Sequence, residues 1–455
     1  EAFLIYIEAA VSNVMLEDSI IGKLLNRLLS MDTKEIYGTL ENNSLGISDT
    51  KELFTLEEAM AAMFAGNAVL FVDGYDRAIK IGSRGYPGSG VQKTDSEKGL
   101  RGSKEAFSES VKMNTALIRK RIRNAKMKAE EKQVGRYSAT TTALLYLDGV
   151  VYLPICEEMR KRLDAFEVDG IEDGGMIEYL TRKKKEGRFP VYQTTERPDR
   201  AAQAILEGRV VLLTDNSPEA LIFPATLNSL FQTADDYYRN ERIVTFLRLI
   251  RYVAAFLALA LPGLYVAAAT FHPQLLPGNL IRSMAEARSG VPFPTAAEVL
   301  LMELSFELLR EAGLRMPGPA GNTIGIVGGL IVGQAAVSAN LVSPITVTVA
   351  ALTALGSFSI PNEELSEVFR LWKYGILLLG SCFGILGVML GCFLLLMLMA
   401  EQESYGIPWL YPYVGGNLNE RADEKDSMFL AAARKRKRRP IFAKWGNRIR
   451  FSRKA

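Results

Sequence analysis

The sequence predicts an α/β cytoplasmic region of two related subdomains, followed by an α-helical multi-pass transmembrane domain. Three observations lead to this prediction. Charged residues are dense up to about residue 240, whereas none occurs from Met316 to Pro361 or from Tyr374 to Ala400. Strand-like and helix-like stretches alternate in the charged half. Two pairs of segments in that half resemble each other, which indicates an internal repeat.

Composition limits the classes of function. The chain has 455 residues, of which 48% are hydrophobic and 23% charged, and its mean hydropathy of +0.08 is high for so many charges. A formal net charge of +3 is small for this length, so we expect no nucleic-acid partner. The few dispersed cysteines (Cys156, Cys382, Cys392) and the single histidine, His272, suit neither a disulfide framework nor a metal cluster. We therefore expect no metal, no cofactor and no catalytic residue, and hence no enzyme.

The internal repeat lies in the charged half. AAMFAGNAVLFVDGYDRAIKI resembles AAQAILEGRVVLLTDNSPEALIF, so that Gly66 aligns with Gly208, and LIYIEAAV from Leu4 aligns with LLYLDGVV from Leu144. The opening EAFLIYIEAA has no initiator Met and reads as part of a strand, so we expect residues upstream of it. The predicted domains are an N-terminal α/β subdomain, a basic helical linker, a second α/β subdomain, a transmembrane helical domain and a basic cytoplasmic tail, at residues 1–100, 101–140, 141–240, 241–415 and 416–455.

The predicted linker contains a strongly basic run. FSESVKMNTALIRKRIRNAKMKAEEKQVG has a helical pattern with four basic residues within five positions, which are Arg119, Lys120, Arg121 and Arg123. Helical spacing spreads these side chains around the helix surface. The run is either a solvated helix that joins the two subdomains, or an assembly surface for anionic lipid headgroups or for an acidic face of a partner.

Apolar segments in the second half are candidates for membrane crossings. They are Tyr252–Phe271, Thr323–Leu341, Pro344–Ile360 and Tyr374–Ala400. Basic residues precede the first segment and follow the last, namely Arg242, Arg248, Arg251 and the run from Arg434 to Arg439. Since basic residues mark cytoplasmic flanks, we expect both termini in the cytoplasm and an even number of crossings.

A Leu-rich helical pattern between the apolar segments contains charged residues. AAEVLLMELSFELLREAGLR places Glu303, Glu307, Arg310 and Glu311 on or near one helix face. A charge at the bilayer centre costs roughly 3 kcal/mol or more, so this face must point into a bundle, a partner or water. One hypothesis is a polar pathway, in which a ring of carboxylates favours cations. The alternative is an amphipathic interfacial helix whose glutamates pair with Arg310.

Three further patterns concern helix contacts and helix ends. GxxxG spacing relates Gly325, Gly329 and Gly333, which favours close helix packing, with a glycine-lined conduction path as the alternative. The aromatic residues Trp409, Tyr411 and Tyr413 resemble an interfacial belt. In TERPDRAA, we expect Pro198 in the first turn of a helix, with Thr195 or Asp199 helping to cap it.

The chain also contains a series of ordered sequence blocks. Those in the charged half include LFVDGYDRAIKI, RGSKEAFSESVKMNTALIRKRIR, VGRYSATT and TERPDRAAQAILEGRVVLLTDNSPEALIFPAT, and those in the apolar half include ARSGVPFP, ELSFELLREAG and IVGGLIVGQAAVSANLVSPI. Over nearly the whole chain they resemble the A subunit of the GerA family, the nutrient-germinant receptors of endospore-forming bacteria. One family motif contains Glu196, Arg197, Pro198 and Asp199. Lys104, Ala106 and Lys120 depart from the family's usual block around the basic helix but keep most of its charge.

The resemblance implies a multi-pass protein of the spore inner membrane or cell membrane that works with two partners. One is a transporter-like B subunit, which is expected to bind the nutrient, and the other is a lipoprotein C subunit. The resemblance also implies a homo-oligomer, in contact with membrane lipid, that forms a nutrient-gated cation channel and triggers spore germination.

Three alternatives stay open. Within the family, the chain could be the paralogue that accompanies the SpoVA complex and amplifies germination through ion release. A secondary transporter would require more crossings and an inverted repeat in its membrane half, whereas the repeat found here lies in the charged half. A non-conducting scaffold for the B and C subunits is the third.

Overall fold

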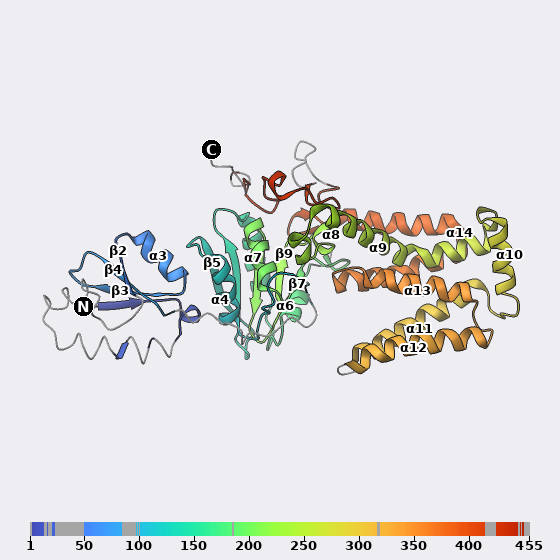
Figure 1. Ribbon diagram of the computed structural model, residues 1–455, viewed down its shortest axis with the longest axis horizontal. Coiled ribbons are helices and arrows are strands. Elements are labelled where there is room, and N and C mark those ends of the chain that lie inside the picture. The colour runs from blue at the N-terminus through green and yellow to red at the C-terminus, as the bar shows by residue number, and fades with distance from the viewer. Residues whose placement is uncertain are drawn as a thin grey trace.

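The computed structural model describes residues 2–12, 16, 21–22, 50–83, 97, 99, 101–183, 186–315, 319–414, 425–444, 446, 448 and 449. Along the chain it forms a four-stranded sheet, a five-stranded sheet and a group of long helices. Figure 1 shows these parts one after another along the long axis, with the blue N-terminal sheet at one end and the helices at the other. The chain is therefore a mixed α/β protein with a helical second half.

Four short antiparallel strands form the first sheet, in the order β1-β3-β4-β2. They are β1 (Ala2–Ile5), β2 (Thr50–Leu53), β3 (Ala68–Val72) and β4 (Ala78–Ile81). Helix α3 (Leu56–Phe64) begins where the Thr55 side chain accepts a hydrogen bond from the Glu58 backbone. It ends just before Gly66, whose φ of 85° favours glycine. Alanines of α3 pack against Val69, so α3 covers one face of this sheet.

Five antiparallel strands form the second sheet, in the order β5-β6-β8-β9-β7. They are β5 (Met127–Val134), β6 (Thr140–Leu147), β7 (Gln193–Thr195), β8 (Val210–Thr214) and β9 (Ala220–Phe223). Alternation along β6 sends Leu144 to one face and Leu145 to the other. The face of Leu145 is covered by α4 (Val111–Arg121) and α7 (Pro198–Glu207), and that of Leu144 by α5 (Leu153–Asp164) and α6 (Gly174–Thr181). The central strands are therefore buried on both faces.

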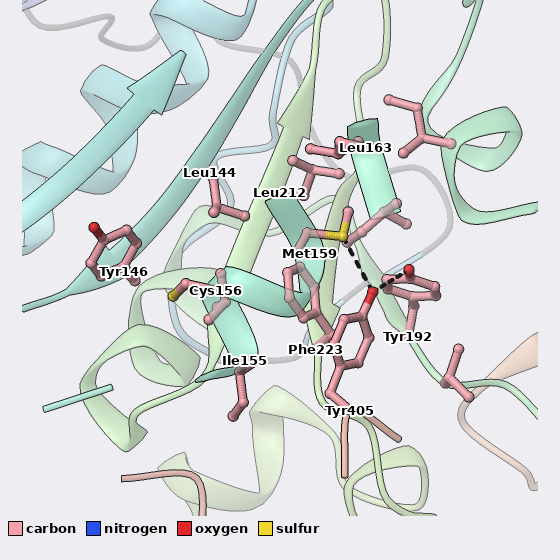
Figure 2. Close-up of a cluster of buried hydrophobic side chains, with 14 of the residues drawn as sticks. Leu144, Tyr146, Ile155, Cys156, Met159, Leu163, Tyr192, Leu212, Phe223 and Tyr405 are labelled. Carbon is pink, nitrogen blue, oxygen red and sulfur yellow. Dashed lines mark hydrogen bonds between the residues drawn. The ribbon is translucent and has the colours of Figure 1, made fainter. Parts of the chain in front are cut away.

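Figure 2 shows the core on the α5 side of the second sheet. Leu212 and Phe223 of the strands meet Met159 of α5 there. Tyr405, from the far end of the chain, enters the same core and stacks on Phe223, with 4.7 Å between ring centroids. Its hydroxyl is hydrogen-bonded to the hydroxyl of Tyr192 and donates to the Met159 sulfur at 3.2 Å. The core of the second sheet is thus completed by a segment more than 180 residues beyond β9.

The two sheets share one strand order. The order β1-β3-β4-β2 of the first corresponds to β6-β8-β9-β7 of the second. The register agrees as well, since Leu70 lies opposite Ile79 in the first sheet and Leu212 lies opposite Leu221 in the second. The second sheet differs by its additional edge strand β5. The segments aligned in the sequence therefore occupy equivalent positions in the two sheets.

The basic run is not one continuous helix, which differs from the helical linker expected over residues 101–140. Helix α4 ends at Arg121, and the chain then pairs as β5 with the whole length of β6. Met127 of β5 lies in the same core as α4. The Lys, Ala and Glu residues of β5 favour a helix locally, but pairing with β6 outweighs this weak preference. Helix and strand are both parts of the second sheet's structure.

Long helices form the second half of the chain. They are α9 (Glu241–Thr270), α10 (Gly278–Ala287), α11 (Thr295–Arg315), α12 (Pro319–Ser338), α13 (Pro344–Phe358) and α14 (Glu363–Glu401). Within the described residues, α9 and α14 are long and apolar enough to cross a membrane by length and composition. The predicted segments Thr323–Leu341 and Pro344–Ile360 correspond to α12 and α13. The number of crossings stays a prediction.

Helix α14 folds back on itself at Gly384, so the one uninterrupted helix predicted over Tyr374–Ala400 is wrong. Gly384 has φ 63° and ψ −144°, which interrupts the helix. A Cβ added at Gly380 would lie 2.9 Å from Val388, and one added at Gly391 would lie 2.9 Å from Ile376. Glycines on both sides of the turn therefore let two antiparallel arms approach closely. The sequence pattern could not reveal this turn, because both arms are equally apolar.

The chain after α14 returns to the second sheet. Trp409 is 0% exposed and stacks on Phe189 at 4.9 Å between centroids, and its indole nitrogen donates to the Pro190 carbonyl at 2.8 Å. Tyr411 is also buried, so an interfacial belt does not hold for these two residues, whereas Tyr413 is half exposed. The described part of the expected C-terminal tail likewise packs on the protein, for instance through the buried Phe442. In Figure 1 this red segment lies beside the second sheet.

Candidate functional site

Helices α11 and α14 meet through a group of ion pairs. Glu303 and Glu307 are four positions apart and so share one face of α11, while Arg370 and Lys373 share a face of the first arm of α14. The Lys373 ammonium lies 2.6 Å from the Glu303 carboxylate and 3.4 Å from that of Glu307. Arg370 lies 2.7 Å from the other oxygen of Glu307. We call these four residues the α11–α14 ion-pair cluster.

The α11–α14 ion-pair cluster is balanced in charge but incompletely hydrogen-bonded. Glu303 is 1% exposed and Lys373 4%, whereas the other two residues keep some exposure. One oxygen of Glu303 and the hydroxyl of Tyr374 are buried without a hydrogen-bond partner within the described structure. Burying opposite charges is favourable only when geometry and hydrogen bonds compensate for lost hydration. Burying the Glu303–Lys373 pair therefore costs free energy that an apolar contact at the same position would not.

The other two charged residues predicted for the polar face of α11, Arg310 and Glu311, are not members of this cluster. Arg310 lies 4.0 Å from Glu363 and stacks over the Phe358 ring at 4.9 Å, and Glu311 is exposed. Glu303 and Glu307 pair with Arg370 and Lys373 of α14. The interfacial alternative had supposed that they pair with Arg310. Sequence analysis missed Arg370 and Lys373. The signal available was their three-residue spacing at the start of an apolar stretch, which resembles an ordinary basic flank.

A second buried carboxylate, Glu298, also went unnoticed in the sequence. It lies at the start of α11, is 0% exposed, and pairs with Arg288 at 3.2 Å. It accepts hydrogen bonds from the Ser343 backbone at 3.0 Å and the Thr346 hydroxyl at 3.1 Å. A carboxylate at the N-terminus of α13 is stabilised by the helix dipole and unpaired amides. Glu298 therefore joins α11 to α13.

The glycines of α12 lie against neighbouring helices. A Cβ at Gly329 would contact Phe306 at 3.7 Å, and one at Gly333 would contact Val347 at 3.4 Å. These contacts are typical of close packing against α11 and α13. Gly325 belongs to the same helix.

The family motif forms a buried ion pair at the start of α7. Arg197 makes two hydrogen bonds to Asp199, at 3.1 and 2.9 Å, and Pro198 occupies the first helical turn. Arg197 takes the N-cap position without a side-chain cap bond, but the Thr195 hydroxyl accepts a hydrogen bond from the Arg197 backbone at 3.1 Å and so helps to order the helix start. Burial raises the pKa of Asp199, but hydrogen bonds from Arg197 and Tyr238 outweigh this and hold it below its ordinary value. The Glu196 carbonyl accepts a hydrogen bond from the Phe107 backbone N–H at 2.8 Å, so the motif anchors the segment before α4.

Lys120 and Arg121 of the basic run form ion pairs within the protein. Glu105 lies 2.7 Å from Lys120 and 2.6 Å from Arg121. Arg119 stacks over the Phe64 ring at 5.7 Å, and Arg123 is exposed with its Nε donating to the Lys120 carbonyl. Their charge is therefore partly committed to contacts between α4, the preceding segment and α3.

Arginines at the start of α9 are also engaged by the protein. Arg248, 1% exposed, donates to Asp236 of η4 (Ala234–Tyr238) at 3.0 Å and to Asp426 at 3.0 Å. Arg251 donates to Asp236 at 2.9 Å. These contacts join α9 to the second sheet and the C-terminal segment. Within the described residues, no group of His, Cys, Asp and Glu is arranged to hold a metal ion.

Comparison with known proteins gives the family. The family described as Bacillus/Clostridium GerA spore germination protein matches residues 1–442, so this chain belongs to the GerA family, that of the germinant-receptor A subunits. It is 36% identical to the uncharacterized membrane protein YfkQ of Bacillus subtilis over 430 residues, 94% of this chain and 83% of that protein. Spore germination protein KA of the same organism is 34% identical over 408 residues, 90% of this chain and 75% of its own.

Two further matches are a curated protein and a crystal structure. Stage V sporulation protein AF of Bacillus subtilis is 30% identical over 391 residues, 85% of this chain and 78% of that protein. The crystal structure of the N-terminal domain of the A subunit of the Bacillus megaterium spore germinant receptor GerK3 is 25% identical, covering 50% of this chain and 83% of its own, with a TM-score of 0.37.

Proposed function

We propose that this chain is the A subunit of a spore germinant receptor and assembles in the membrane as a nutrient-gated cation channel. The observation that supports the proposal is the α11–α14 ion-pair cluster within an apolar helical region. Charges in a membrane are expensive, and where they persist they commonly mark an ion path or a moving element. Membership of the GerA family supplies the germination role.

The ion pairs act as a latch between α11 and the first arm of α14. In the closed state the carboxylates of Glu303 and Glu307 are neutralised by Lys373 and Arg370. In the open state α11 and α14 move apart, and the freed carboxylates face the ion path, where their negative charge favours cations. Nutrient binding shifts the population toward this state only if the nutrient binds it more tightly.

The complex is proposed to contain a transporter-like B subunit, which binds the nutrient, and a lipoprotein C subunit. It is placed in the spore inner membrane or cell membrane, as a homo-oligomer of A subunits that contacts lipid. An even number of crossings puts the N- and C-termini in the cytoplasm. The proposed role requires no cofactor and no enzymatic step.

Potassium flux tests the latch directly. The chain is expressed with its B and C partners in vegetative membranes, and flux is followed with a fluorescent potassium reporter before and after a panel of amino acids and sugars. Glu303→Gln and Lys373→Met each break the latch, so we expect basal flux to rise several-fold without nutrient. The double variant removes both charges together and is expected to return basal flux toward that of the wild type.

Glu401→Gln is the matched control, because Glu401 ends the other arm of α14, is 60% exposed and pairs with Arg188, outside the cluster. It should leave both basal and nutrient-dependent flux unchanged. If an assembled complex responds to its nutrient and yet neither Glu303→Gln nor Lys373→Met alters flux, the latch is refuted. An assembled complex that conducts under no nutrient condition, but still supports germination, indicates the non-conducting scaffold.

A second role is favoured by the 30% identity to stage V sporulation protein AF. In that case the chain accompanies the SpoVA complex and amplifies germination through ion release. The two roles differ in what opens the path. Flux that requires the B and C partners supports the nutrient receptor, whereas flux that is independent of them supports the SpoVA-associated role.

A further inference from the structure

A small cavity lies where the C-terminal segment meets the second sheet, away from the α11–α14 ion-pair cluster. Its volume is about 50 Å³, and its lining includes Arg209, Tyr237, Asp426, Arg436 and Phe442. An adjoining cavity of about 30 Å³ is also lined by Arg209. A water molecule needs roughly 10–15 Å³ of such space, so the larger cavity has room for roughly three or four oxygen-sized atoms.

Arg209 brings a buried positive charge to both cavities. The residue is 6% exposed, its guanidinium lies 4.4 Å from the centre of the Phe442 ring, and Nη1 donates to the neutral Gln193 side chain at 3.1 Å. Within the described part of the chain Nε has no acceptor and the guanidinium forms no ion pair. Burial lowers the pKa of Arg209 below its ordinary value. A buried charge without a close counter-ion is costly, so the site favours an anion.

Arg436 reaches the same cavity from the C-terminal segment. Its Nη1 donates to Asp426 at 3.2 Å, its guanidinium lies 5.3 Å from the centre of the Tyr237 ring, and its Nε is buried with no acceptor among the residues that the structure describes. Asp426 is already engaged, because it also accepts hydrogen bonds from Arg248 at 3.0 Å and Tyr237 at 3.1 Å. Two unsatisfied guanidinium donors, from segments far apart in the sequence, therefore line one cavity.

Glu207 is the acidic residue that lines both cavities together with Arg209. Its side chain is buried and accepts a hydrogen bond from Gln203 at 3.2 Å. Its negative charge offsets part of the positive potential, but it leaves the Nε donors of Arg209 and Arg436 without acceptors. A ligand with several acceptor oxygens matches guanidinium groups better than a chloride ion does, because each N–H then meets its own oxygen.

We propose that this cavity binds a small oxyanion, a phosphate or carboxylate group, between Arg209 and Arg436. The bound anion joins the C-terminal segment to the second sheet. Through Arg436, Asp426 and Arg248 the same contacts continue to the start of α9. Anion occupancy therefore strengthens the connection between the sheet and the long helices, whichever of the proposed roles the chain has.

Thermal unfolding of the purified full chain in detergent tests the site. Inorganic phosphate is titrated against chloride at constant ionic strength. We expect the wild-type Tm to rise by several degrees along a saturating curve, since a ligand stabilises the state that binds it. Phosphate also stabilises proteins generally through exclusion from their surface, but that effect does not saturate and occurs in every variant.

Arg209→Gln should abolish the saturating part of the shift, and Arg436→Gln should weaken the apparent affinity by about tenfold or more. Arg188→Gln is the matched control, because Arg188 lines a different cavity and pairs with Glu401. It should retain the wild-type curve. If Arg209→Gln does not fold, Arg436→Gln provides the same comparison, since its side chain is partly exposed.

Two further titrations distinguish the source of the anion. A saturating shift with inorganic phosphate or acetate identifies a free anion, and a shift only with micelles that contain phosphatidylglycerol identifies a lipid headgroup. The absence of any saturating, Arg209-dependent shift with all three overturns the proposal and leaves a cavity filled by water. None of these measurements uses ion flux, so failure here and failure of the proposed channel are separate results.

Discussion

The two sheets have the same strand order but differ in what covers them. The first sheet packs against α3 on one face and against Val11 and Leu16 on the other, and its edge strand β1 leaves Phe3 exposed. The second is buried on both faces, by α4 and α7 on one side and by α5 and the C-terminal segment on the other. Helix α7 is the counterpart of α3 in the repeat, so in the described structure the second sheet is distinguished by the C-terminal segment, which adds Tyr405 and Phe442 to its core. The same segment connects this sheet to the long helices.

The difference is clearest at the residue that follows the positive-φ glycine after α3 and after α7, Gly66 and Gly208. Asn67 donates from its side chain to the Ala62 carbonyl at 3.0 Å, so it closes the end of its own helix. The equivalent residue of the second sheet, Arg209, reaches away to Gln193 and to Phe442 of the C-terminal segment. The first sheet satisfies its helix end locally, and the second uses the same position for a long-range contact.

The largest predicted effect concerns equivalent core leucines. Leu212→Ala should cost about 4 kcal/mol, because Leu212 is enclosed by strands, α5 and the C-terminal segment. Leu70→Ala should cost only about 2–3 kcal/mol, because Leu70 lies opposite Leu4 of the partly exposed edge strand β1, which can move into part of the cavity. Hydrogen exchange of the β8 and β3 amides in the full chain measures the stability of each sheet separately. Equal losses of protection would show that the extra cover adds no stability.

Glycine substitutions give the next largest contrast. Gly66 and Gly208 both have positive φ, at 85° and 94°, so alanine costs about 1–2 kcal/mol at either site. At Gly208 the new Cβ would also lie 2.7 Å from the Ala443 backbone, which would push the C-terminal segment away. We expect Gly208→Ala to lose about 1 kcal/mol more than Gly66→Ala and to speed proteolysis near Phe442. A Gly208→Ala protein with an undisturbed C-terminal segment would contradict this contact.

The smallest effect depends on pH and concerns the helix start that follows each edge strand. In the second sheet Asp199 has a lowered pKa, so its ion pair stabilises the fold fully above about pH 4 and loses this contribution as pH falls through the folded pKa. At pH 7, Asp199→Asn should cost about 1–2 kcal/mol, and this difference should shrink toward zero at strongly acid pH. Thermal unfolding at several pH values measures it.

The control for that prediction lies in the first sheet, where α3 begins with a neutral cap. Thr55→Ala should cost about 1 kcal/mol at every pH, because its hydrogen bond to the Glu58 backbone involves no titrating side chain on the capping residue. A loss for Asp199→Asn that is constant with pH would show that the carboxylate acts by shape and not by charge.

Only part of the candidate site could be inferred from the sequence. Glu303 and Glu307 were recognisable, because charges four apart in a Leu-rich pattern are unusual and share a helix face. Lys373 was not, because it is 70 residues away from Glu303 and no local pattern states which helix it meets. The same reason explains why Arg209 was missed, because its unusual feature is that no described acidic residue forms an ion pair with it, and no sequence motif signals this.

The sequence by itself determined the division into a charged α/β half and an apolar helical half, and the alignment between the two sheets. Those features depend on residue composition and on repeats of two or about four positions, which are local properties. Only the tertiary structure decided that β5 is a strand, that α14 turns back at Gly384, and that the C-terminal segment completes the core around Tyr405. Each of these outcomes depends on contacts between distant segments, whose combined burial and hydrogen bonding outweigh local preference.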